Sequence, residues 1–341
     1  MPRVAGVDPG TISIDVCGLE DGELYLDRTI PTAAALADPA GFVSLLRGAR
    51  PPDLIAGPSG YGLPLVPAAS ATEEDLRLAF LTAPGEEGGI GGLRRLARML
   101  GSSGLPVVYT PGVIHLDTVP AHRKLNRVDL GTADKVALAA LAIADQCDRL
   151  GGPPAEASFL LLELGGAFTA ALAVCGGRVV DGLGGSSGAM GLRSSGGWDG
   201  EVAYLAGTVT KDHLFQGGAA FLSGDAAPAL AESALKAVHA LRVSVPAPRE
   251  ILLSGRGLAE PGVEPLLRDG LAGLAPVRRL EGFARVAKTA AQGAAILADG
   301  LAGGRWSGLV ETMRIREAAG TALDHLVVIS PAEARRRLGL G

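Results

Sequence analysis

The sequence contains the same short pattern twice, and this repeat constrains the fold more than any other feature. Asp8 in VDPGT and Glu163 in LELGG are 163 − 8 = 155 positions apart. The same spacing aligns two further pairs of glycines, Gly10 with Gly165 and Gly22 with Gly177. Each copy predicts a strand, a loop with an acidic residue and glycine, a second strand, a tight glycine turn and a third strand. The repeat therefore predicts two lobes that share one design.

Asp8 follows the apolar run VAGV, so we expect it at the end of a buried strand. An isolated carboxylate is strongly destabilising in an apolar setting, which argues against a position inside the strand. Gly10 and Thr11 offer backbone N–H groups and a hydroxyl to phosphate oxygens, and a carboxylate at a strand end holds Mg²⁺ through water. The alternative is an ordinary strand-end turn in which Asp8 bonds the backbone. For Glu163, the alternative is a buried acid with a local partner, but the repetition favours phosphate binding for both.

Composition excludes several classes of protein. A chain of 341 residues predicts two domains, and 50 glycines separate its apolar runs. The formal net charge of −5 gives no general attraction to nucleic acid or to an anionic membrane, so a small-molecule enzyme fits better. Neither GxxxxGK[ST] nor GxGxxG occurs, which excludes the commoner nucleotide-binding motifs.

The cysteines and the N-terminus favour a cytoplasmic protein. The three cysteines are odd in number and form no CxxC, so the sequence predicts neither a disulfide framework nor a structural zinc site. No charged segment followed by an apolar one marks a signal peptide. The most apolar window, residues 158–177, contains Glu163 and a Gly-Gly pair, so we expect two buried strands there rather than a membrane span.

Turn residues and helical spacing suggest three parts. We expect a first lobe over 1–150, a second over 151–305 after the linker GGPPA, and a helical tail over 306–341 that packs on the first lobe. Residues 132–150 are apolar nearly all round and predict a buried helix that bridges the lobes. We also expect a long Ala-rich helix over about 283–301 and, in the tail, a short strand at LVVIS, residues 326–330.

The quoted motifs resemble those of the acetate and sugar kinase, heat-shock-protein and actin superfamily. VDPGT is similar to its first phosphate motif, LELGGAFTAALAV to its second, ILLSGRGL to its adenosine motif and AKTAAQGAAILADG to its second connecting helix. More narrowly, the segments AGPSGYGLPL, YTPGVIHLDTVPAHRKLNRVDLGTADK and WDGEVAYLAG resemble a prokaryotic family of predicted butyrate kinases. The resemblance implies an α/β fold of duplicated actin-like, ribonuclease H-like domains with a nucleotide cleft between them.

The resemblance also implies ATP and Mg²⁺ as cofactors. It assigns phosphate binding to Asp8, Gly10, Thr11, Glu163, Gly165 and Gly166, with Asp8 and Glu163 as metal ligands. It assigns the border of the adenosine site to Ser254, Gly255, Arg256 and Gly257. The chain departs from the superfamily pattern by having Glu163 in place of the usual Asp and SGRG in place of paired glycines.

The polar segment 115–135 contains the remaining candidate catalytic side chains. Arg123 and Lys124 are candidates for holding an anionic acceptor, and their alternative is solvated loop charge. Asp129 or Asp134 is the candidate base if the acceptor is a hydroxyl, whereas a carboxylate acceptor needs none. Asp134 is also explained by the preference for acids in the first turn of a helix. His115 and His122 lack metal-ligand spacing, and the loop 57–62 is a candidate for the acceptor side.

The sequence thus predicts a kinase of the acetate or butyrate type that transfers the γ-phosphoryl group of ATP to a small acceptor. Two other functions stay open: an ATPase that drives a conformational change in a partner protein, and a nucleotide sensor without turnover. The expected partner is a small molecule rather than nucleic acid or membrane, and a homodimer is an open possibility.

Overall fold

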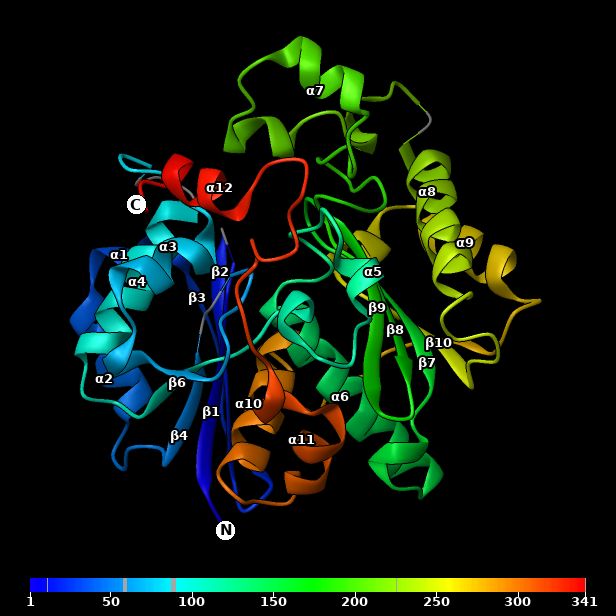
Figure 1. The fold of residues 1–341 in the computed structure, drawn as a ribbon. Helices are drawn as coiled ribbons and strands as arrows, with labels where there is room; N and C mark the ends of the chain where they lie inside the picture. The colour runs from blue at the N-terminus through cyan, green and yellow to red at the C-terminus, as the bar shows by residue number, and fades with distance from the viewer. Residues whose placement is uncertain (11, 58–59, 87–89, 225, 341) are drawn as a thin grey trace. The chain divides into compact units, whose positions relative to one another are not determined.

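The computed structural model describes the whole chain except residues 11, 58–59, 87–89, 225 and 341 (Figure 1). Two compact units emerge from its internal packing. Unit 1 contains residues 1–128, 132–155 and 281–341, and unit 2 contains residues 129–131 and 156–280. Residues 281–305, expected with the second lobe, lie in unit 1, as does the tail.

The sheet of unit 1 has six strands in the order β3-β2-β1-β4-β6-β5. Their bounds are β1 Arg3–Pro9, β2 Ser13–Glu20, β3 Glu23–Pro31, β4 Leu54–Gly57, β5 Val66–Pro67 and β6 Val107–Tyr109. The first three strands are antiparallel, β4 and β6 are parallel to β1, and β5 is antiparallel to β6. The carboxyl ends of β1, β4 and β6 therefore meet at one edge of the sheet.

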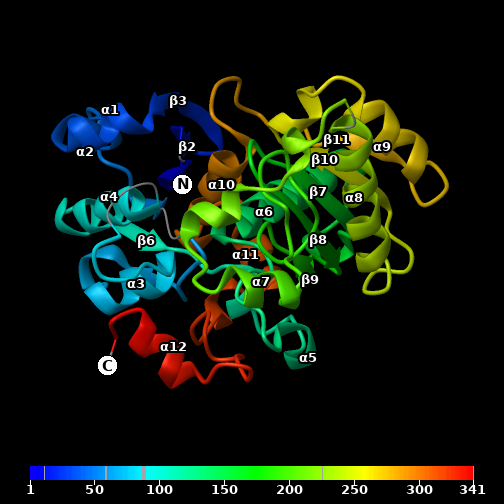
Figure 2. The same cartoon turned by 90° about the horizontal axis from the view of Figure 1, so that it is seen from above.

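Helices cover both faces of this sheet (Figures 1 and 2). The helices of unit 1 are α1 Thr32–Ala37, α2 Pro39–Arg47, α3 Glu73–Phe80, α4 Ile90–Ser102, α5 Ala121–Lys124, α6 Ala133–Leu150, α10 Thr289–Leu301, α11 Ser307–Met313 and α12 Pro331–Arg337. Helices α1 to α4 bury their apolar residues against Ala5 and Val7 of β1, with Phe42 and Phe80 in the same core. On the other face, α10 packs against β1 and α6.

Two glycines allow α10 to approach its neighbours this closely. A Cβ atom on Gly6 of β1 would lie 2.2 Å from the backbone nitrogen of Ala295. A Cβ atom on Gly293 would lie 1.8 Å from the carbonyl oxygen of Ala137 in α6. Because real Cβ atoms do not approach so closely, α10 fits between β1 and α6 only while both positions are glycine.

Unit 2 contains a five-stranded sheet in the order β11-β10-β7-β8-β9. Its strands are β7 Phe159–Leu164, β8 Thr169–Cys175, β9 Arg178–Leu183, β10 Glu250–Ser254 and β11 Val277–Arg279, and its helices are α7 Gly200–Ala206, α8 Ala226–Leu241 and α9 Val263–Leu271. Leu162 and Leu253 of the sheet share a core with Leu230 of α8 and Leu267 of α9. The apolar window 158–177 thus forms strands β7 and β8, as predicted.

The structure confirms the duplication. The strand order β3-β2-β1-β4-β6 corresponds to β9-β8-β7-β10-β11, and β4 and β10 are each parallel to the first strand of their unit. A register shift lies between Gly18 and Leu19 in one copy and between Ala173 and Val174, at the same spacing, in the other. The following turns also match, since the residue pairs 21–22 and 176–177 all have positive φ. The fold is therefore a pair of actin-like α/β domains.

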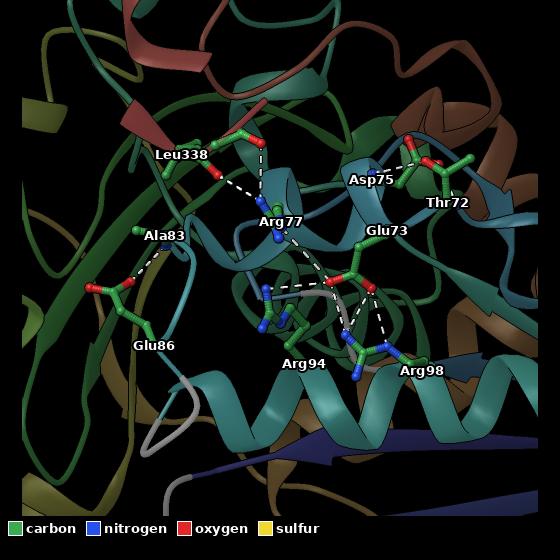
Figure 3. A network of polar contacts seen from close by, with 10 residues as sticks. Thr72, Glu73, Asp75, Arg77, Ala83, Glu86, Arg94, Arg98 and Leu338 are labelled. Atoms are coloured by element: carbon green, nitrogen blue, oxygen red, sulfur yellow. Dashed lines mark hydrogen bonds and ion pairs between the residues drawn. The ribbon is translucent and has the colours of Figure 1, made fainter. Parts of the chain in front are cut away.

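The tail of the chain packs within unit 1 through polar contacts and through a small apolar cluster of Leu78, Leu323 and Ala334. The side-chain oxygen of Asn126 accepts hydrogen bonds from the N–H groups of Val327 and Val328 at 2.7 and 2.9 Å. The expectation of a strand at 326–330 is wrong, because these N–H groups bond a side chain rather than a neighbouring strand. Near the C-terminus, Arg77 of α3 donates to the carbonyl oxygen of Leu338 at 3.2 Å (Figure 3).

A network of charges stabilises the face of unit 1 that includes α3 and α4. Glu73 accepts hydrogen bonds from Arg98 at 2.8 and 3.1 Å and lies 3.4 Å from a guanidinium nitrogen of the buried Arg94 (Figure 3). Arg77 is the third arginine near this carboxylate, at 3.9 Å. Removing Glu73 would therefore leave a buried guanidinium without its partner.

None of the described helices combines the length and the apolar character needed to span a bilayer.

Candidate functional site

The carboxyl edge of the sheet in unit 1 gathers several of the candidate residues. Asp8 is the second-to-last residue of β1, and the turn containing Gly10 follows it. The loop after β4 reaches the same edge, where the carbonyl oxygen of Gly60 accepts a hydrogen bond from Ala133, the first residue of α6, at 3.0 Å. In parallel sheets this edge is the usual position of a ligand site.

Asp8 is only 9% exposed and interacts electrostatically with Asp134. Burial and the charge of Asp134 raise the pKa of Asp8 to about 7, although Lys288 and Lys135 lower it. A buried carboxylate beside a second acid is costly to ionise unless a cation is present. The sequence therefore placed Asp8 correctly at the strand end, and the structure adds a second acid as its neighbour.

Asp134 lies in the first turn of α6, as the sequence predicted. Its carboxylate accepts a hydrogen bond from the hydroxyl of Thr132 and lies 2.6 Å from Nζ of Lys135. Burial opposes ionisation, but the charge and hydrogen bond of Lys135 and the hydroxyl of Thr132 lower the pKa of Asp134 below its usual value. Asp134 is therefore ionised at neutral pH and is available as a carboxylate rather than as an acid.

These two acids fit a magnesium ion held largely by water. Among the residues that the structure describes, no group of three or more His, Cys, Asp or Glu side chains is gathered to hold a metal. Mg²⁺ commonly keeps several waters and takes one or two carboxylates together with substrate phosphates. A cation at Asp8 would also relieve the repulsion between Asp8 and Asp134, so the donor set suits this ion.

Sequence reasoning missed Asp15 and Lys288, which lie at the same edge. Asp15 of β2 pairs in register with Asp8 and is 1% exposed. Its carboxylate forms an ion pair of 2.8 Å with Nζ of Lys288, the residue before α10. A signal existed for Asp15, since an acid inside the apolar strand ISIDVCG requires a partner. No local signal marks Lys288, which is 273 residues away.

The two glycine turns do not offer all the phosphate contacts that the sequence suggested. The N–H of Gly10 donates to the carbonyl of Ser13 at 2.8 Å, and the N–H of Gly165 donates to that of Phe168 at 2.8 Å. Both N–H groups therefore close their own hairpins, so other groups must supply the phosphate contacts at each turn. Thr11 lies outside the described residues.

In unit 2 the candidate phosphate and adenosine motifs lie together. Glu163 of β7 pairs in register with Ser254 of β10. Gly255 has φ +97°, and a Cβ atom there would lie 2.2 Å from the carbonyl oxygen of Leu164. A Cβ atom on Gly257 would lie 2.8 Å from Cβ of Leu164. These glycines thus allow the loop after β10 to pack directly on the end of β7.

The other residues of the phosphate and adenosine motifs of unit 2 differ in how far neighbouring atoms cover them. A Cβ atom on Gly166 would meet nothing within 4 Å, so no neighbouring atom requires glycine at this position. Arg256 is exposed, whereas Ser254 is buried. Glu163 lies in unit 2, whereas Asp8 lies in unit 1.

Asp129 holds a turn of unit 2. Its carboxylate accepts hydrogen bonds from the N–H groups of Gly131 and Ser186 at 3.1 and 3.0 Å, and from the hydroxyl of Ser186 at 3.0 Å. Both oxygens of this carboxylate therefore accept hydrogen bonds from groups within unit 2. The geometry therefore favours a structural role for Asp129 over the candidate role of general base.

Lys124 of unit 1 also has a structural role. It is 7% exposed, and its Nζ donates to the carbonyl of Leu116 at 2.7 Å, so it is not a solvated loop charge. Burial lowers the pKa of Lys124. Arg123, its neighbour in α5, is partly exposed and remains a candidate for binding the acceptor. His115 is buried and its pKa is lowered to about 4 by burial, so it is neutral at physiological pH.

Comparisons of the structure with solved structures support the fold. Similar chains include the propionate kinase of Francisella tularensis subsp. tularensis SCHU S4, at TM-score 0.59 and 13% identity, covering 86% of this chain and 99% of that one. The acetate kinase of Entamoeba histolytica matches at TM-score 0.55 and 13% identity, over 80% and 87%. That of Porphyromonas gingivalis matches at TM-score 0.53 and 15% identity, over 80% and 88%.

At these identities the similarity concerns the fold, which is the actin-like ATPase fold of the acetate kinases. None of the curated proteins compared with the chain matches it in sequence. One family model, described as "Protein of unknown function (DUF1464)", matches residues 6–328. Because this match spans most of the sequence, the chain belongs to the DUF1464 family.

Proposed function

We propose that this protein is an ATP- and Mg²⁺-dependent phosphotransferase that acts on a small acceptor, a short-chain carboxylic acid of the acetate or butyrate class. The repeated hairpin supports this most. In each unit an acid lies at the end of the first strand, and the following turn closes with the same 2.8 Å hydrogen bond from a glycine N–H. The acetate and propionate kinases with the same fold support the choice of acceptor class.

The proposed roles follow from the surroundings of each residue. Asp8 and Asp134 would hold Mg²⁺, which neutralises charge on the phosphates when bound. Within unit 2, Glu163 with the turn 165–166 would contact phosphate, and the loop 254–257 would border adenosine. Arg123 would orient the acceptor carboxylate.

A carboxylate acceptor is already ionised, so no side chain of the site has to take a proton from it. One acceptor oxygen attacks the γ-phosphorus, the new P–O bond forms, and the bond from that phosphorus to the bridging oxygen breaks, so ADP leaves with the electron pair. No proton moves in this step, so no general base is needed. This agrees with an Asp129 whose carboxylate is occupied by backbone donors.

The proposal is tested by measuring the transfer of the phosphoryl group directly. Purified protein is incubated with Mg²⁺ and ATP, with and without acetate, propionate, butyrate and longer acids, and both ADP and acyl phosphate are measured, the latter by trapping with hydroxylamine. Acid-dependent formation of both products in equal amounts supports the proposal. ADP release that no acid stimulates would instead indicate an ATPase, and tight nucleotide binding without release would indicate a sensor.

A further inference from the structure

We propose that Lys288 binds a phosphate of the nucleotide, and that two carboxylates of the hairpin β2–β3, Asp15 and Asp27, hold it in position. This inference rests on the proposed function, since it names a ligand of the same site in unit 1. Lys288 lies in the segment AKTAAQGAAILADG, which resembles a connecting helix and suggested no ligand contact.

Lys288 is fixed at both its backbone and its side chain. Its Nζ lies 2.8 Å from Oδ2 of Asp15, and its N–H donates to Oδ1 of the same carboxylate at 3.2 Å. The hydroxyl of Ser13 also donates to Asp15, at 3.1 Å. Asp15 is therefore an anchor with its own support, and the ammonium has little freedom to move away.

The anchor directs the ammonium to the phosphate turn. A Cβ atom on Gly10 would lie 3.2 Å from Nζ of Lys288. Gly10 is thus the residue type that leaves room for the ammonium beside the turn. Because the N–H of Gly10 is used within the hairpin, the ammonium of Lys288 supplies a donor beside this turn.

The charges also favour an anionic ligand at this point. An ammonium has three N–H donors; Nζ forms an ion pair with Asp15, and its charge also acts on Asp8. The side chain is 29% exposed, so it is only partly covered by the protein. Lysine binds phosphate as a compact point charge, and the N-terminus of α10 adds partial positive charge beside it.

Asp27 positions the chain just before Lys288. Its carboxylate accepts hydrogen bonds from the N–H groups of Arg285, Val286 and Ala287 at 2.9, 3.0 and 2.6 Å. Three consecutive N–H groups on one carboxylate hold this segment in an open, non-helical course. Asp27 therefore acts on the ligand through Lys288, as a positioning residue.

The experiment compares nucleotides that differ in their phosphates. Binding of ATP, ADP and AMP is measured by calorimetry with Mg²⁺ for the wild type, Lys288→Met, Lys288→Arg and Asp27→Asn. Lys236→Met is the control, because Lys236 is an exposed lysine of unit 2. We expect Lys288→Met to weaken the binding of ATP and of ADP at least tenfold and the binding of AMP less than twofold. Lys288→Arg should recover part of the lost affinity, and the control should bind all three nucleotides as the wild type does.

Asp27→Asn should weaken the binding of ATP by three- to tenfold and leave the binding of AMP unchanged. General damage to the fold would instead weaken the binding of all three nucleotides. If Lys288→Met leaves Asp15 unpaired and unfolds the protein, the double variant Asp15→Asn/Lys288→Met removes both charges and should show the same selective loss. Wild-type affinity for ATP in a folded Lys288→Met protein, or an equal loss for AMP, would overturn the assignment.

The two proposals fail in different ways. A wild type that binds ATP through Lys288 but phosphorylates no acid refutes the phosphotransferase and keeps the role of Lys288. An active kinase that is indifferent to Lys288→Met refutes the role of Lys288 alone. A wild type that binds neither ATP nor ADP overturns both.

Discussion

Replacing Gly293 by alanine tests whether α10 is as tightly enclosed as the structure indicates. The new Cβ atom would lie 1.8 Å from the carbonyl oxygen and 2.4 Å from the carbonyl carbon of Ala137. Favourable contacts between carbon atoms lie near ~3.5 Å, so α10 and α6 must separate by more than about 1 Å. On its other side α10 meets the backbone of β1 at Gly6, which leaves it no direction in which to move.

The expected change in stability is the sum of two opposing terms. Alanine in a helix interior gains about 1 kcal/mol over glycine. Overpacking a core costs about 1–3 kcal/mol and occasionally more, and backbone atoms on both sides of the helix put Gly293→Ala at the upper end or above it. We therefore expect a net loss of at least about 2 kcal/mol in the free energy of unfolding.

Gly308→Ala is the matched control. Gly308 lies in α11 of the same unit, and a Cβ atom there would meet nothing within 4 Å. This variant should be neutral or up to about 1 kcal/mol more stable. The two variants make the same chemical change, so their difference of about 3 kcal/mol isolates the clash.

The assay uses the two tryptophans of the chain, Trp198 in unit 2 and Trp306 in unit 1. In a Trp198→Phe background the fluorescence of Trp306 reports urea unfolding of unit 1 alone. A difference of 3 kcal/mol corresponds to a midpoint shift of about 1 M urea. Equal midpoints for Gly293→Ala and Gly308→Ala would refute the close packing of α10, and with it the positions derived for Lys288 and Asp134.

Three further changes test the site and its support. Asp8→Asn should keep the fold, as seen by circular dichroism, but lose at least about 100-fold of Mg-ATP turnover in an assay of ADP release, and unchanged turnover would contradict its role. Glu73→Gln should lower the free energy of unfolding by about 1–2 kcal/mol, because a buried guanidinium loses its partner, while the exposed Glu23→Gln should not. His115 has a folded pKa of about 4 against 6.5 ordinarily, so the unfolded state binds more protons between these values. Stability should rise with pH across this window by up to about 3 kcal/mol, and a His115→Gln variant that keeps the same rise would exclude His115 as its source.

The repeat allowed the sequence to predict the fold in detail. A spacing of 155 derived from Asp8 and Glu163 also relates the hairpin hydrogen bonds, the register shifts and the positive-φ turns. These features recur together because a hairpin fixes its own register through its turn and its ladder of hydrogen bonds. The features that determine this register lie close together in the sequence, so a pattern of strand, glycine and turn is enough to predict it.

The charged residues were less predictable because their roles depend on burial and on distant partners. Arg123 and Lys124 are adjacent in sequence, yet Lys124 is buried on a backbone carbonyl and Arg123 is partly exposed. Asp129 and Asp134 both suggested catalysis, but only the first is surrounded by backbone donors. Residue type and spacing do not reveal which side of a loop faces the core.

The start of α10 shows how such a distant contact alters local structure. Helical spacing predicted a helix from about residue 283, but α10 begins at Thr289. Asp27 and Asp15 accept hydrogen bonds from the N–H groups of residues 285–288, and this satisfies them without helical partners. A helix extending back to 283 would turn the N–H of Lys288 to the carbonyl of residue 284 and away from Asp15. The point at which the helix begins therefore determines whether the ammonium of Lys288 lies beside Gly10, so two strand carboxylates set both the boundary of the helix and the proposed phosphate contact.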